Sequence, residues 1–356
     1  MSDLGQLIFT GISGAGLTSE EEKFLETENI GGVILFSENF ESPAQLAELI
    51  NHIQRCRREY PLFIAVDHEG GRVTRFSKGF SEIPAMRDIG KTNSPKLAFH
   101  LSKIMAEELK TCGINVNLSP VCDILMNEDN KVIGDRSFGE SEEVVSKFVS
   151  SFIRGFQTQN ILACAKHFPG HGSTSKDSHF DLPYVKRTLE ELREHEFKAF
   201  SKAIKARVEF VMMAHLVVDA IDTELPTSLS SKAYDLLRNE LRYNGVILTD
   251  DMEMKAIADR YSTEEAAVMA ISAGADMIEY RNFDESVKAL EALKEAKKTK
   301  VLRNDVVAEK IDRISRCKKA HLSDYSPIYI PEIGKKLNTG ASQALIREIN
   351  DKISQL

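Results

Sequence analysis

Residues 166–183 concentrate side chains that could transfer a proton. The segment reads KHFPGHGSTSKDSHFDLP, and its prolines and glycines exclude a regular helix or strand, so we expect a polar loop. Asp177 precedes His179 by two residues, which is close enough for its carboxylate to hold the imidazole and its proton. An imidazole has an ordinary pKa of roughly 6.5 and can carry a proton at neutral pH. These two residues are therefore candidates for a general acid/base pair.

Ionisable side chains also close several short apolar runs of the sequence. They are Asp67 with Glu69 and Arg75, Asp135 with Arg136, Lys166 with His167, His215, and Asp250 with Asp251. One such residue alone is usually a solvated loop residue or a helix cap, and Asp251 fits that reading. Their recurrence behind five separate runs favours one shared site. If the runs are parallel strands of a barrel, their carboxyl ends meet at one mouth, where active sites form.

Eight short β-branched runs bounded by turn residues are candidate strands. They cover residues 6–10, 31–36, 62–67, 114–121, 161–168, 210–218, 245–250 and 275–280. Stretches with helical apolar spacing lie between them, and three begin with a capping box, at Thr18, Thr188 and Ser262. Strands that alternate with helices pair in parallel through right-handed crossovers. We therefore expect an α/β fold, specifically a closed (β/α)8 TIM barrel.

A doubly wound open sheet is the rival architecture. Its usual Gly-x-Gly-x-x-Gly turn after the first strand is missing, since Gly11, Gly14 and Gly16 have a different spacing. The composition changes only near the carboxyl end, where prolines interrupt the helical pattern. We therefore predict one catalytic barrel over residues 1–322 and a C-terminal extension over residues 323–356 that packs on it.

The composition is that of a globular enzyme, with 42% hydrophobic and 28% charged residues in 356. A net charge of -8 and the lack of a Lys/Arg block argue against a nucleic-acid partner. The five cysteines are scattered, which predicts neither a disulfide framework nor a zinc knuckle. We see no signal-type start and no apolar run of membrane length, so we expect a cytoplasmic location and no membrane partner.

Six segments together resemble glycoside hydrolase family three, in particular its single-domain β-N-acetylglucosaminidases. The segments are IGGVILF at 30–36, IAVDHEGGRVTRF at 64–76, NVNLSPVCDI at 115–124, VIGDRSF at 132–138, KHFPGHGSTSKDSH at 166–179 and GVILTDDMEM at 245–254. The chain departs from the family in detail. The family often has Gln where His68 stands, Asp where Ser173 stands and Leu-Ser-Met at 252–254, and it is less charged at 277–281.

The resemblance implies a retaining hydrolase that needs no cofactor or metal ion. Its expected partner is a small carbohydrate, an N-acetylglucosamine-containing muropeptide derived from peptidoglycan and met during cell-wall recycling. Asp250 would be the nucleophile, and Asp177 with His179 would form the acid/base dyad. The sugar-binding residues that the resemblance implies are Asp67, Arg75, Arg136, Lys166 and His167.

Four alternatives stay open at this point. The sugar's own acetamido group could attack, with Asp250 and Asp251 assisting. Phosphorolysis is a second alternative, because a histidine acid/base would not repel phosphate. A sugar-binding protein without activity is a third, although it gives the nucleophile and the dyad no role. The fourth is a metal-dependent barrel hydrolase, whose ligands would be His167, His171, Asp177 and His179.

Overall fold

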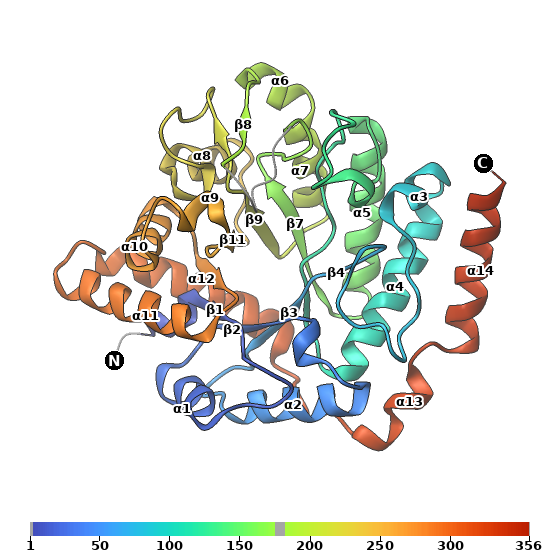
Figure 1. The fold of residues 1–356 in the computed structure, drawn as a ribbon, viewed down its shortest axis with the longest axis horizontal. Coiled ribbons are helices and arrows are strands. Elements are labelled where there is room, and N and C mark those ends of the chain that lie inside the picture. The colour runs from blue at the N-terminus through green and yellow to red at the C-terminus, as the bar shows by residue number, and fades with distance from the viewer. Residues whose placement is uncertain (1–2, 175–181, 356) are drawn as a thin grey trace.

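Eight parallel strands form a closed barrel surrounded by helices in the computed structural model, which describes residues 3–174 and 182–355 (Figure 1). The order of the strands around the barrel is β1-β12-β11-β9-β7-β6-β3-β2. Their bounds are β1 Ile8–Thr10, β2 Gly32–Leu35, β3 Phe63–Val66, β6 Val116–Asn117, β7 Leu162–Phe168, β9 Phe210–Met213, β11 Val246–Asp251 and β12 Met277–Tyr280. The predicted (β/α)8 barrel is confirmed.

Two of the predicted strands are less than half as long as the apolar runs that suggested them. Within residues 114–121 only β6 pairs regularly, because Pro120 has no N–H to donate to a ladder; the pairing with β7 resumes as a single bridge between Val121 and Lys166. The run 210–218 divides into β9 and a separate strand. That strand, β10 (Val217–Val218), leaves the barrel and pairs with β8 (Tyr184–Val185).

The helices begin where the sequence provides caps. All three predicted capping boxes are present, at Thr18, Thr188 and Ser262. The helix predicted after Thr188 is broken at His195 into two pieces. The larger helices are α1 Ser19–Glu28, α2 Pro43–Arg55, α4 Pro95–Cys112, α5 Glu142–Gln157, α7 Glu196–Lys205, α10 Thr263–Ala273, α11 Phe283–Lys298 and α12 Asn304–Leu322; shorter ones are α3 Met86–Lys91, α6 Leu189–Glu194, α8 Ser231–Asp235 and α9 Lys255–Ala258. None of the described helices combines the length and the apolar character that crossing a bilayer requires.

Aromatic rings fill the interior of the barrel. The ring of Phe63 lies 6.0 Å from that of Phe9 and 5.0 Å from that of Phe210, between ring centroids. These residues come from β3, β1 and β9, which are not all neighbours in the sheet, so the rings meet through the interior. The barrel is therefore a packed core, and ligands can enter only at its mouth.

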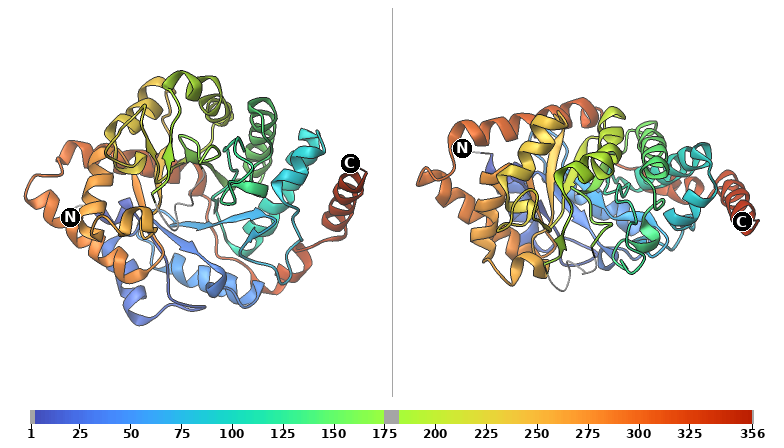
Figure 2. Two further views of the ribbon diagram at one scale, coloured as in Figure 1. Left: turned by 45° about the horizontal axis from the view of Figure 1, so that its top comes forward. Right: turned by 90° about the horizontal axis from the view of Figure 1, so that it is seen from above.

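The last residues lie on the outer side of the barrel helices. Helices α13 (Ile333–Lys336) and α14 (Gly340–Ser354) lie beside α4, and Figure 2 shows α14 standing apart from the barrel wall. The side chain of Asn51 in α2 donates to the backbone oxygen of Ile328 at 3.0 Å and accepts the backbone N–H of Ile328 at 2.8 Å. The backbone N–H of Asn338 donates to Glu108 of α4 at 2.9 Å. Side chains of the barrel helices thus anchor this segment at Ile328 and at Asn338, both ahead of α14.

Candidate active site

The predicted site residues meet at the carboxyl ends of the barrel strands. Asp67 directly follows β3, Lys166 lies in the second half of β7, and Asp250 is the fifth residue of β11. Because the strands are parallel, these three ends lie at one mouth of the barrel. The alternation of strands and helices in the sequence predicted this shared location, and in the structure the three residues lie at the same end of the barrel.

Lys166 is the centre of a buried ion-pair network. Its Nζ lies 2.6 Å from Asp67 Oδ1 and 2.7 Å from Glu69 Oε1. Arg136 donates two hydrogen bonds to the same Glu69 carboxylate, of 2.8 and 2.9 Å. Arg75 reaches the other oxygen of Asp67 at 3.3 Å. Four of the five predicted sugar-binding residues are therefore joined, and Glu69 links Arg136 to the other three.

This network keeps its members charged although they are buried. Burial opposes the ionisation of Glu69, but the positive charges of Arg136 and Lys166 outweigh it and lower the pKa of Glu69. Burial likewise opposes the charge of Lys166, while Asp67 and Glu69 raise the pKa of that ammonium group. The result is a fixed set of charged donors and acceptors, which suits recognition of several sugar hydroxyl groups.

His167, the fifth predicted sugar-binding residue, is oriented by Asp123. Its Nδ1 lies 2.7 Å from Asp123 Oδ2, while its Nε2 faces Arg136 at 3.4 Å. The other oxygen of Asp123 accepts the backbone N–H of His171 at 2.6 Å. Burial opposes ionisation of Asp123, but His167 lowers its pKa. Asp123 thus holds both the imidazole of His167 and the backbone of His171.

The two adjacent aspartates on β11 have different environments. Burial opposes ionisation of Asp250, but the imidazoles of His167 and His215 outweigh it and lower its pKa. Its Oδ1 also accepts the backbone N–H of Asp251 at 2.9 Å. Burial instead raises the pKa of Asp251 to about 7, and that side chain accepts the N–H of Glu253 at 3.0 Å. Of the two aspartates, Asp250 is therefore the one whose surroundings favour the carboxylate, and Asp251 stabilises the following turn.

His215 supports the end of β11 from the neighbouring strand. Its Nδ1 contacts the hydroxyl of Ser228 at 2.7 Å, and its Nε2 lies 2.9 Å from the backbone oxygen of Asp251. The ring is fully buried, which lowers its pKa. The sequence marked His215 only as a polar strand end, and the structure gives it a supporting position beside the candidate nucleophile.

The candidate acid/base residues Asp177 and His179 lie outside the described residues. The described residues on either side of that segment are well anchored. Asn130 donates to Thr174 Oγ1 at 3.2 Å, and Leu182 packs against Val217 and Ala256. Both described anchors lie between the carboxyl end of β7 and β8.

Sequence reasoning noted Glu69 at a strand end without giving it a role, and it missed Asp123. Both stand inside the motifs that were recognised, yet their role depends on partners that lie far away along the chain. Glu69 binds Arg136, 67 residues later, and Asp123 binds His167, 44 residues later. A usable signal was present for Glu69, because it follows a predicted strand end by two residues.

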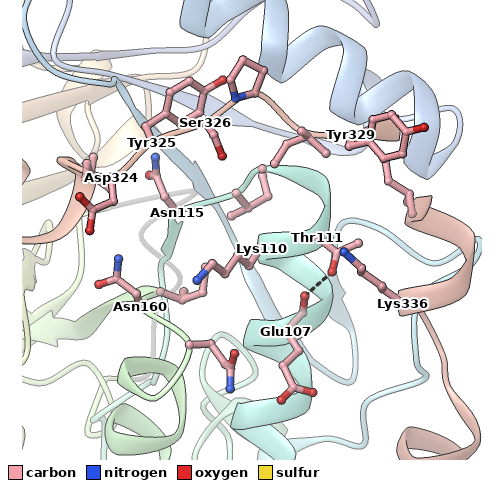
Figure 3. Close-up of a pocket in the computed structure, with 18 of the residues that line it drawn as sticks. Glu107, Lys110, Thr111, Asn115, Asn160, Asp324, Tyr325, Ser326, Tyr329 and Lys336 are labelled. Atoms are coloured by element: carbon pink, nitrogen blue, oxygen red, sulfur yellow. Dashed lines mark hydrogen bonds between the residues drawn. The ribbon is translucent and has the colours of Figure 1, made fainter. Parts of the chain in front are cut away.

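A large cavity opens at the opposite end of the barrel (Figure 3). Its volume is about 930 Å³, and its walls include Asn115 and Ile161, which precede β6 and β7, together with residues 324–329. Figure 3 shows Lys110, Glu107 and Thr111 of α4 along one side. None of the predicted catalytic or sugar-binding residues that the structure describes lines this cavity. The cavity is therefore separate from the candidate site at the mouth.

Comparison with known proteins agrees with this geometry. Residues 2–317 match the glycosyl hydrolase family 3 N-terminal domain. A β-hexosaminidase of Idiomarina loihiensis is 40% identical over 271 residues, which is 75% of this chain and 81% of that protein. A β-hexosaminidase of Nitrosomonas eutropha is 39% identical over 294 residues, covering 81% of this chain and 83% of its own. The structure of a family 3 β-N-acetylglucosaminidase from Paenibacillus sp. FPU-7 superposes with a TM-score of 0.95 at 36% identity, over 98% of this chain and 68% of that one.

Proposed function

Because this chain belongs to glycosyl hydrolase family 3 and is a glycoside hydrolase, we propose that it is a retaining exo-β-N-acetylglucosaminidase. The observation that carries the proposal is the placement of Asp250. It lies at the carboxyl end of β11, is partly accessible at the barrel mouth and accepts the backbone N–H of Asp251, and its surroundings lower the pKa of its carboxyl group. A carboxylate placed in this way can attack an anomeric carbon.

In the first step, Asp250 forms a bond to the anomeric carbon while the glycosidic bond breaks. The proton that the departing oxygen needs comes from His179, whose charged form Asp177 supports. In the second step, His179 takes a proton from water, and the water oxygen attacks the same carbon. The ester bond to Asp250 then breaks, and the free sugar leaves with its original anomeric configuration.

The buried network would bind the sugar that is released. Lys166 and Arg136 present N–H donors, and Asp67 presents an acceptor, all held in place by their mutual pairing. Such groups need not reorganise when the sugar enters, and their hydrogen bonds can strengthen in the oxocarbenium-like transition state. We further propose that the natural substrates are muropeptides from peptidoglycan, processed in the cytoplasm during cell-wall recycling.

Turnover of 4-nitrophenyl N-acetyl-β-D-glucosaminide tests the activity, and Asp250→Asn tests the nucleophile. The variant should keep the fold and lose nearly all turnover, because the amide preserves shape but cannot form the glycosyl ester. A fluorinated substrate should leave its sugar attached to the peptide that contains Asp250. Near-normal activity of Asp250→Asn, or an adduct on another residue, would refute the assignment. Sugar 1-phosphate as the product in phosphate buffer would show a phosphorylase instead.

A further inference from the structure

Glu279 is a buried carboxyl group near the active site that the mechanism above does not use. The residue lies on β12 and is only 3% exposed. Its Oε2 atom has no hydrogen-bond partner among the described residues. Its backbone N–H donates to Thr249 and its backbone oxygen accepts from Met252, so the unsatisfied group is the carboxyl alone. Burying such a group is costly, so its presence needs a reason outside the packing of the core.

The register of the barrel shows where this side chain points. Glu279 is paired with Phe9 of the adjacent strand β1, and the ring of Phe9 packs inside the barrel. Side chains at paired positions of neighbouring strands share a face of the sheet. Glu279 therefore points into the barrel interior, on the same face of the sheet as the Phe9 ring.

The electrostatic surroundings of Glu279 are those of the active site. The charges that act on its carboxyl group belong to Asp67, Asp251, Asp250 and Lys166. Lys166 already pairs with Asp67 and Glu69, so it does not neutralise a further carboxylate. Burial and the neighbouring carboxylates raise the pKa of Glu279 well above its ordinary value. This direction favours the protonated form of Glu279, which offers one O–H donor and an acceptor oxygen.

We propose that Glu279 is a further sugar-binding residue, whose carboxyl group hydrogen-bonds a hydroxyl group on the deep edge of the bound sugar. This inference rests on the proposed function in taking a sugar as the ligand. In an exo-acting enzyme the leaving group points out of the mouth, so the opposite edge of the ring enters first. That edge carries the hydroxyl groups on C4 and C6. A neutral acid that both donates and accepts matches a hydroxyl group, which does the same.

The test compares Glu279→Met, which removes the hydrogen-bonding group, with Glu279→Gln, which keeps a donor and an acceptor. The ligands are N-acetylglucosamine and its 4-deoxy and 6-deoxy derivatives, with dissociation constants measured by ligand-observed NMR. Glu279→Met should weaken binding of the parent sugar about tenfold. For the derivative that lacks the contacted hydroxyl group, Glu279→Met and the unmodified protein should bind with the same affinity. Glu279→Gln should keep most of the affinity for the parent sugar.

Glu209→Gln is the matched control. Glu209 is also a buried glutamate of the barrel, but it precedes β9 at the opposite end and is hydrogen-bonded to Ala163 and Gln157. This variant should leave all three dissociation constants unchanged. Glu279→Met should also raise the melting temperature, because removing an unpartnered buried carboxyl group relieves its desolvation cost.

Unchanged discrimination among the three sugars in Glu279→Met would overturn the proposal, and so would a lowered melting temperature without any change in sugar binding. Hydrolysis of the chromogenic substrate by the unmodified protein is measured in parallel. If Glu279 governs sugar binding but nothing is hydrolysed, the proposed function fails and this inference stands. If hydrolysis is normal and Glu279→Met distinguishes the three sugars as the unmodified protein does, this inference fails and the proposed function stands.

Discussion

Replacing Glu69 by glutamine should destabilise the protein and weaken sugar binding together. Glu69 is 1% exposed and accepts three charge-assisted hydrogen bonds, from Lys166 Nζ and from two nitrogens of Arg136. A glutamine has a single acceptor oxygen, and its NH2 group would face a cation. Lys166 and Arg136 would then keep their buried charges with fewer partners, and their positions for the sugar would relax.

The size of the effect follows from these contacts. Removing one partner of a buried ion pair costs about 3–5 kcal/mol, since the other charge stays buried. Asp67 still pairs with Lys166 at 2.6 Å, so we expect the lower end of that range. Urea denaturation followed by circular dichroism measures the loss, and KM on the chromogenic substrate measures binding. Glu295→Gln is the control, because Glu295 pairs with Lys298 on an exposed face and should leave both quantities unchanged.

The effect should also depend on pH in a defined direction. Burial opposes ionisation of Glu69, but its partners lower its pKa in the folded state. The folded pKa is below the unfolded one, so the stabilisation is complete above the ordinary glutamate pKa of roughly 4.3 and is lost as the pH falls. The gap between wild type and Glu69→Gln should therefore shrink in acid. A loss under about 1 kcal/mol at pH 7 with unchanged KM would refute this account of the network.

Three further outcomes are expected. His179→Ala should slow turnover of natural disaccharides far more than that of a dinitrophenyl glycoside, and Asp177→Asn should show the same pattern more weakly. Azide should restore turnover of the dinitrophenyl glycoside. Equal loss on all substrates, without restoration by azide, would show that the dyad is not the acid/base. Burial lowers the pKa of Lys318 to about 7, so between pH 7 and about 10.5 the unfolded chain binds more protons than the folded chain and stability rises with pH. Lys318→Met should remove this rise, and identical pH profiles of unfolding for the two proteins would contradict the reasoning. Gly172→Ala should lower kcat, because a Cβ there would stand 1.7 Å from the backbone oxygen of Ile124 and displace the segment; unchanged kcat would show that the segment tolerates the shift.

The sequence alone determined the barrel and the position of its mouth. Eight apolar runs, each followed by a helical pattern, suffice for that, because both periodicities are local properties of the chain. Local hydrogen bonds also explain why the capping boxes at Thr18, Thr188 and Ser262 were predicted correctly. The acid/base residues Asp177 and His179 were proposed from their spacing and remain a prediction.

The tertiary structure decided which of the polar strand ends cooperate and in what state of charge. Glu69 and Asp123 owe their roles to partners that are distant in the sequence, and Glu279 owes its role to a carboxyl oxygen that has no partner among the described residues. Neighbouring residues in the sequence reveal neither property. The same holds for the adjacent pair Asp250 and Asp251, since the pairing of β11 with β12 shifts register between Leu248 and Asp251. The shift places one carboxylate near two imidazoles and the other over a turn. A pKa depends on burial and on charges through space, and both exist only once the chain has closed into the barrel.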